Sequence, residues 1–251
     1  MASLWLQRFW TWRPRTLSAR LARVGLWVLL VYVLIALISP VLFGIGLLPD
    51  VNTGLENEIN APPSLEHWCG TNRLGQDVCA RTIAGAGVAL KVVVLALTLA
   101  LIVGVPLGML SGYFGGPVDR ALVLLMDTVY SLPVVLLAVV MAFLLGQGLL
   151  NAAAALCVVY VPQYFRVVRN QTASVKAELF VEAAQSLGAG PVWIMRKYLF
   201  RNVITSVPVV LTMNAADSVL MLGSLGFLGL GLPARSEEHT SELQSHSDLV
   251  C

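Results

Sequence analysis

Charged side chains are scarce in this chain. Asp, Glu, Lys and Arg make up 12% of its 251 residues, whereas hydrophobic residues make up 57%. A soluble domain is usually about 25% charged, so charge is depleted about two-fold. Because a hydrocarbon environment penalises charge, this composition indicates a polytopic membrane protein.

Groups that bind metals, nucleic acids or phosphates are also few. The four cysteines form no C-x-x-C pair and the three histidines are scattered, so we predict no metal site. The net charge is only +2, which gives no support to a nucleic-acid partner. No G-x-x-x-x-G-K-[ST] phosphate loop occurs, so any ATP chemistry belongs to another protein. We therefore expect no catalytic site and no cofactor in this chain.

Long apolar runs are what the chain has instead. A helix needs about 20 apolar residues to cross the hydrocarbon core of a bilayer. Five runs suit such crossings, at 24–49, 92–118, 121–145, 149–165 and 203–232. The predicted fold is all-α, a polytopic bundle of transmembrane helices.

The charges between these runs predict the orientation. Residues 1–23 hold five arginines and no acid, so this basic leader is expected in the cytoplasm, before a first transmembrane helix (24–49) too long for a signal peptide. Acids outnumber bases in the loop 50–82, which we place outside. Bases outnumber acids in 166–202, which we place back inside.

The cytoplasmic loop 166–202 is long and predicts a helical hairpin. Its first part is rich in helix formers, with Val175, Leu179 and Ala183 four residues apart along one face. Gly188 and Gly190–Pro191 then interrupt the pattern, as at the end of one helix and the start of the next. The exposed apolar face of such a hairpin suits a groove in a partner protein.

Four segments of the chain carry a family resemblance. The cytoplasmic loop contains Glu182-Ala183-Ala184 followed by Gly188, which resembles the EAA loop of ABC importer permeases. Residues 67–77 read H-x-x-G-T-N-x-x-G-x-D, residues 112–119 read G-Y-x-G-G-x-x-D, and residues 225–231 read LGFLGLG. These resemble, in the same order, the segments of the dipeptide, oligopeptide and nickel importers, second permease type. The family has a proline nineteen residues after the glutamate, where this chain has Arg201.

The resemblance implies a function and a set of partners. Residues 83–234 would be the permease core, with Glu182, Ala183, Ala184 and Gly188 docking a cytoplasmic ATPase. The implied partners are a second homologous permease, two ATP-binding cassette subunits and an extracytoplasmic solute-binding protein. The cargo would be peptides or a related small solute such as nickel. The chain would lie among the lipids of a prokaryotic inner membrane, its N-terminus in the cytoplasm.

Polar residues inside the apolar runs are candidates for function or packing. Asn214 and Asp217 lie deep in the fifth run and are candidates for the translocation path. For Asp127 we favour a structural role, paired with a neighbouring polar group. Gly104, Gly108 and Gly112 are four residues apart, which suits close packing of helices.

Two rival functions would each need different features in the same apolar runs. An ion-driven secondary transporter would couple through intramembrane charges and broken helices, and transport without any ATPase would favour it. A membrane enzyme would need convergent ionisable groups at one depth, which the apolar runs lack. Cys69 and Cys79 lie in the outer loop, where thiols can be oxidised, but we favour free thiols over a disulfide.

The last residues differ in character from the rest. Residues 235–251 are polar, and Arg235 to Ser245 matches the translation of a common sequencing-adapter oligonucleotide. We interpret this tail as artefactual and carrying no site. The family resemblance implies a sixth transmembrane helix beyond it, so five of an expected six are visible.

Overall fold

The computed structural model describes residues 17–46, 48–49 and 57–230. The chain divides into two compact units, Met1–Leu90 and Lys91–Cys251. Among the described residues, four helices are long and apolar enough to cross a membrane, and a fifth crossing is available if one bent pair of helices counts as a span. The all-α polytopic prediction is therefore confirmed. The predictions for residues 1–16 and for the tail 235–251 lie outside the described residues.

The first unit contains α2 (Leu17–Gly44), a loop, and the beginning of α3 (Val78–Phe114). The first predicted crossing, 24–49, falls largely on α2. The two helices approach closely, since the Tyr32 hydroxyl donates a hydrogen bond to the Ala86 carbonyl at 3.3 Å. A Cβ on Gly87 would lie 3.0 Å from the Ser39 Oγ, so this glycine allows the approach.

The loop before α3 corrects one prediction, because Cys69 and Cys79 form a disulfide. An antiparallel bridge joins Thr71 to Asp77. The same antiparallel register places position 69, two residues before Thr71, opposite position 79, two residues after Asp77. The Cα atoms of the two cysteines lie 5.4 Å apart. This separation is within the range that a disulfide spans. The preference for free thiols was wrong because the loop folds back on the helix start.

Asp77 holds the end of this loop. Its carboxylate accepts the Ala80 backbone N–H at 2.8 Å and lies 2.9 Å from the His67 Nδ1. Burial raises the pKa of Asp77, but the hydrogen bonds from Ala80 and His67 outweigh it and hold the pKa below its usual range. The His and Asp of the segment 67–77 thus close the loop onto the first turn of α3.

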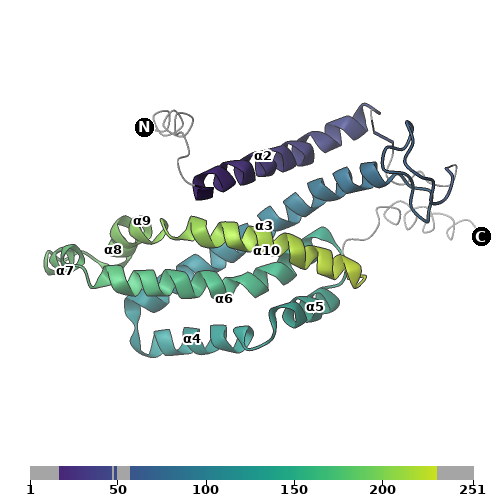
Figure 1. Cartoon of the computed structure of the whole chain (residues 1–251). Helices are drawn as coiled ribbons and strands as arrows, with labels where there is room; N and C mark the ends of the chain where they lie inside the picture. Colours follow the sequence, from purple (N-terminus) through teal and green to yellow (C-terminus); the bar gives the residue numbers. More distant parts are fainter. Residues whose placement is uncertain (1–16, 47, 50–56, 231–251) are drawn as a thin grey trace, which may run out of the picture. The chain divides into compact units, whose positions relative to one another are not determined.

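The second unit is built around α6 (Leu149–Lys176), against which α4 (Gly116–Tyr130), α5 (Val134–Leu145) and α10 (Val207–Phe227) all pack. Figure 1 shows α6 between α4 and α10. Its largest buried side chains, Tyr160, Tyr164 and Phe165, are at most 1% exposed. An apolar helix that is buried this extensively forms the core of a bundle.

The third predicted crossing, 121–145, is not one straight helix. The structure has α4 (Gly116–Tyr130) and α5 (Val134–Leu145), whose axes are bent by 88° at residues 131–133. Pro133 explains the break, because proline has no backbone N–H to donate and disfavours helical geometry in the residue before it. The run 121–145 can therefore form the expected crossing only as a bent pair of helices.

The glycine spacing on α3 has the expected consequence. A Cβ on Gly104 would lie 2.8 Å from the Tyr164 Cβ, one on Gly108 would lie 2.7 Å from the Phe165 carbonyl oxygen, and one on Gly112 would lie 2.5 Å from the Arg169 carbonyl oxygen. Real Cβ atoms essentially never come this close. The prediction that these glycines serve close helix packing is confirmed, and the partner helix is α6.

Candidate functional site

The EAA residues lie on a short helix, α7 (Leu179–Ser186), that ends in a defined cap. The Ala189 N–H donates to the Ala184 carbonyl at 3.0 Å and the Gly188 N–H donates to the Gln185 carbonyl at 2.9 Å. This is the hydrogen-bond pattern of a Schellman cap, which requires a left-handed residue just past the helix. Gly188 has φ +83° and supplies that conformation without steric cost.

Three of the four predicted docking residues face solvent in this chain. Glu182, Ala183 and Gly188 are exposed, whereas Ala184 is 7% exposed and packs inward. Leu179 and Leu187 beside them are also exposed. A hollow of about 470 Å³ adjoins this surface. Its lining residues are Ala184, Leu187, Gly188, Ala189, Gly190, Trp193 and Tyr198. An exposed acid, exposed leucines and a hollow together form a surface suited to another protein.

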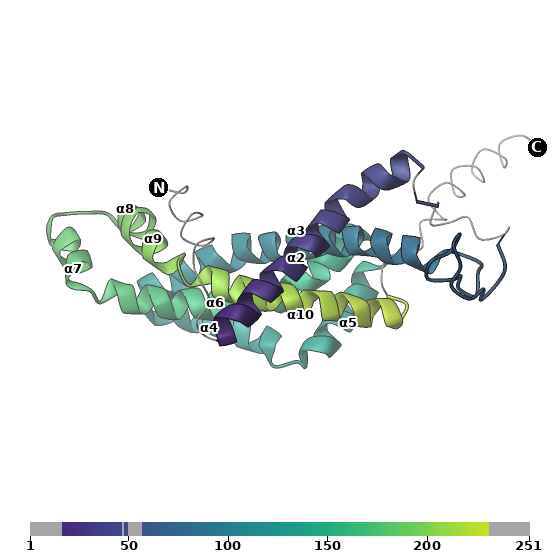
Figure 2. The same ribbon diagram turned by 45° about the horizontal axis from the view of Figure 1, so that its top comes forward.

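The return path anchors this surface to the bundle. After α7 the chain passes through α8 (Pro191–Ile194), the π-helix η1 (Met195–Leu199) and α9 (Phe200–Val203) before α10. Ile194, Leu199 and Val203 are at most 1% exposed. Figures 1 and 2 both show α7 and α8 at one end of the α6–α10 pair. The hairpin is therefore a projection held by buried side chains at its base.

One detail of the predicted hairpin is wrong. Val175, Leu179 and Ala183 were expected on one face of a single helix. Instead α6 extends to Lys176 and α7 begins at Leu179, so Val175 belongs to a different helix. The buried positions of α7 are Val181 and Ala184.

A partly buried ion pair near the hairpin was missed from the sequence. The Arg169 guanidinium donates to both carboxylate oxygens of Asp119, at 2.5 and 2.6 Å, and the Ser111 hydroxyl donates to the same carboxylate at 2.5 Å. The Lys176 Nζ donates to the Tyr113 carbonyl at 2.6 Å. These contacts tie the end of α3, the start of α4 and the end of α6 together. The sequence feature that could have indicated this contact is Asp119, the last residue of the segment G-Y-x-G-G-x-x-D.

Asp127 pairs with a neighbouring polar group, as expected. Its carboxylate accepts from the Arg166 Nη2 at 2.7 Å, and the same guanidinium lies 4.2 Å from the centre of the Tyr130 ring. Both side chains of the pair are about half exposed, at 52% for Asp127 and 43% for Arg166. The arrangement fits the structural role that the sequence favoured.

Asn214 and Asp217 lie on α10 but differ in surroundings. Asp217 is exposed, and its carboxylate accepts the Tyr160 hydroxyl from α6 at 3.0 Å. Asn214 is 4% exposed. Within the described part of the chain, its Nδ2 and the buried Tyr164 hydroxyl have no hydrogen-bond partner. The α6–α10 interface thus combines an open carboxylate with unsatisfied buried polar atoms.

The described residues hold no group of three or more His, Cys, Asp or Glu side chains that would bind a metal ion.

Known proteins resemble this chain in sequence. Residues 104–245 match the family model described as "Binding-protein-dependent transport system inner membrane component". That range reaches into the tail 235–251, whose origin stays a prediction.

Individual relatives agree with the family match. The dipeptide transport system permease protein DppC of Alkalihalophilus pseudofirmus is 34% identical over 87% of this chain and 71% of its own length. The glutathione transport system permease protein GsiD is 30% identical in Pectobacterium atrosepticum and 31% in Escherichia coli O157:H7. This chain spans 65% and 64% of those two proteins, which is just under two thirds.

A solved structure agrees on the fold. A chain of the MetNI methionine ABC transporter, in an inward-facing conformation, has a TM-score of 0.51 and 22% identity, and the match covers 58% of this chain and 73% of that chain. The ion-driven alternative finds no support among these relatives. The chain belongs to the family of binding-protein-dependent transport system inner membrane components, the permease subunits of ABC importers.

Proposed function

We propose that this chain is the permease subunit of an importer for peptides or a related small solute, driven by ATP hydrolysis in a separate subunit. Its N-terminus lies in the cytoplasm, and α7 with Gly188 docks into a cytoplasmic ATP-binding cassette subunit. A second homologous permease completes the path, two ATPase subunits drive it, and an extracytoplasmic solute-binding protein delivers the cargo. The substrate class follows from the dipeptide and glutathione systems that the relatives' names give.

The exposed surface of α7 carries the docking proposal. Glu182 and Ala183 face outward on a helix that projects from the bundle, beside exposed leucines and a hollow. A small residue such as Ala183 lets another protein approach closely, and an exposed carboxylate can meet a basic group there. The rigid cap at Gly188 fixes the direction of the chain, so motion of a docked ATPase would be passed to η1 and α10.

Changing Glu182 tests the docking directly. We expect Glu182→Gln to reduce co-purification with the ATPase subunit about ten-fold, because losing one partner of an interfacial charge pair costs at least about 1.4 kcal/mol. The matched control is Glu178→Gln, which neutralises another exposed glutamate, just before α7 begins. Equal capture of the ATPase by both variants and the unmodified chain would refute docking through Glu182.

We further propose that Asp217 lines the translocation path and that Asn214 joins it when α6 and α10 separate. An exposed carboxylate in the middle of an apolar helix is expected to face a polar or water-filled interior. Each unsatisfied buried polar atom costs about 1–3 kcal/mol, which applies to the Asn214 Nδ2 and the Tyr164 hydroxyl. Opening this interface to water would offer both groups hydrogen-bond partners.

Transport by an Asp217→Asn variant tests the path. We expect dipeptide uptake to fall about ten-fold with membrane expression unchanged, since a path-lining carboxylate contributes on the scale of a charge-assisted hydrogen bond. The control is Ser224→Ala, on the same helix, where the lost hydroxyl donates to the backbone carbonyl of Leu220. Unchanged uptake and expression in Asp217→Asn would exclude both a path role and a packing role for this residue.

A further inference from the structure

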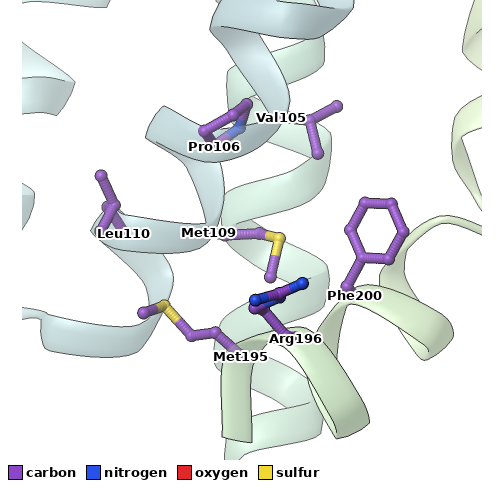
Figure 3. Close-up of a pocket in the computed structure, with 7 residues that line it drawn as sticks. All are labelled: Val105, Pro106, Met109, Leu110, Met195, Arg196 and Phe200. Carbon is purple, nitrogen blue, oxygen red and sulfur yellow. The ribbon is translucent and has the colours of Figure 1, made fainter. Parts of the chain in front are cut away.

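A cavity lies between α3 and the π-helix that returns from the hairpin. Its volume is about 540 Å³, within the range of about 300–1,000 Å³ that small-molecule sites occupy. Its lining residues are Val105, Pro106, Met109, Leu110, Met195, Arg196 and Phe200. Figure 3 shows the Arg196 side chain between Met109 and Phe200. The cavity is thus apolar except for a single cation.

Arg196 is the basic residue that lines this cavity, and three of its basic neighbours have partners of their own. Arg166 pairs with Asp127, Arg169 pairs with Asp119, and the Lys197 ammonium lies 4.6 Å from the centre of the Trp193 ring. Arg196 has no ion pair or side-chain hydrogen bond with any residue in the described ranges, and no acid lines its cavity. An unpaired guanidinium over an apolar lining is complementary to an anion attached to a hydrocarbon chain.

The local backbone is unusual on both walls of the cavity. Arg196 lies in η1 (Met195–Leu199), a π-helix, and such segments occur frequently at functional sites. On the opposite wall, Pro106 interrupts the hydrogen bonding of α3. Val105 and Met109 are under 9% exposed, while Leu110 and Phe200 are 36% and 45% exposed. The cavity therefore has a buried apolar floor and an open apolar rim.

The position of the cavity relative to the bilayer limits the class of ligand that could reach it. Val105 to Leu110 lie in the second half of the charge-free run 92–118, and Arg196 lies in the basic loop that follows the fourth crossing. With the orientation of the proposed function, on which this inference rests, both are at the cytoplasmic membrane surface. We propose that this cavity binds an anionic phospholipid, with its phosphate at Arg196 and its acyl chain along Val105, Met109 and Leu110. Basic pockets between membrane helices on this side take such headgroups.

Native mass spectrometry of the full chain in detergent tests the proposal, with phosphatidylglycerol and phosphatidylcholine of the same acyl chains as probes. We expect the unmodified chain to retain phosphatidylglycerol in preference to phosphatidylcholine. Arg196→Gln should weaken phosphatidylglycerol binding about five-fold or more, the scale of one basic residue against an anionic lipid. The control is Arg201→Gln, an exposed arginine outside the cavity. It should bind as the unmodified chain does.

A second variant tests the apolar half of the site. Leu110→Trp enlarges an exposed side chain on the rim, so it should reduce binding of both lipids while leaving the fold intact. Equal phosphatidylglycerol binding by Arg196→Gln and Arg201→Gln would overturn the proposal, as would equal binding of the two lipids by the unmodified chain. A cross-link from position 110 to a second permease subunit would also overturn it, since that subunit would then fill the cavity. Lipid binding is measured without any ATPase, so its failure is distinct from a failure of docking at Glu182.

Discussion

Replacing Gly108 by leucine is expected to prevent the chain from folding into a stable bundle. Even the single Cβ of alanine would lie 2.7 Å from the Phe165 carbonyl oxygen and 2.9 Å from the Val168 Cβ, both on α6. Alanine gains about 0.5–1 kcal/mol over glycine in a helix interior. Overpacking costs about 1–3 kcal/mol and more for a larger side chain. The clash therefore outweighs the gain in helix propensity, and Gly108→Ala should already be destabilised.

Thermal stability in detergent, followed by size-exclusion chromatography, measures this effect. We expect a lower melting temperature for Gly108→Ala and aggregation for Gly108→Leu. The matched control is Gly85→Leu, in the same helix, where nothing lies within 4 Å of the added Cβ and the site is exposed. If Gly108→Leu remained monodisperse and as stable as Gly85→Leu, the close approach of α3 and α6 would not contribute to the fold.

The features that the sequence predicted are those that depend on local chemistry. Apolar length located the crossings, because the bilayer imposes a fixed thickness on every helix. A four-residue spacing of Gly104, Gly108 and Gly112 predicted a close contact, since such residues share a helix face. Gly188 predicted the end of α7, because few other residues adopt a left-handed conformation. These local patterns did not predict which helix packs against each face.

The features that the sequence did not predict depend on where distant segments meet. The disulfide follows from the register of the Thr71–Asp77 bridge, which a cysteine spacing alone does not specify. The contact between Asp119 and Arg169 joins residues 50 positions apart. Arg196 looked like one of several cations of a basic loop. Its place in the lining of the cavity distinguishes it from Arg201, and its lack of an ion pair among the described residues distinguishes it from Arg166 and Arg169.

Breaking the contact between Asp119 and Arg169 is expected to have the second large effect. The two side chains are 20% and 33% exposed, and the carboxylate also accepts the Ser111 hydroxyl. Removing one partner of a fully buried pair costs about 3–5 kcal/mol, whereas an exposed pair contributes about 0–1 kcal/mol. We expect Asp119→Asn and Arg169→Gln each to cost about 1–3 kcal/mol, between these limits. The double variant should cost less than the sum of the two, since the residues are directly coupled.

The same two helices provide the control for this cycle. Asp127 and Arg166 also join α4 to α6 through a carboxylate and a guanidinium, but both side chains are about half exposed. Their cycle should give a coupling of at most about 1 kcal/mol. Similar coupling energies for both pairs would mean that burial and the Ser111 hydrogen bond add nothing at Asp119. A large difference would assign to Asp119, the last residue of G-Y-x-G-G-x-x-D, the role of fixing α3, α4 and α6 together. Since α6 leads directly into α7, a loosened pair should also weaken the response of the bundle to a docked ATPase, even with every residue of α7 unchanged.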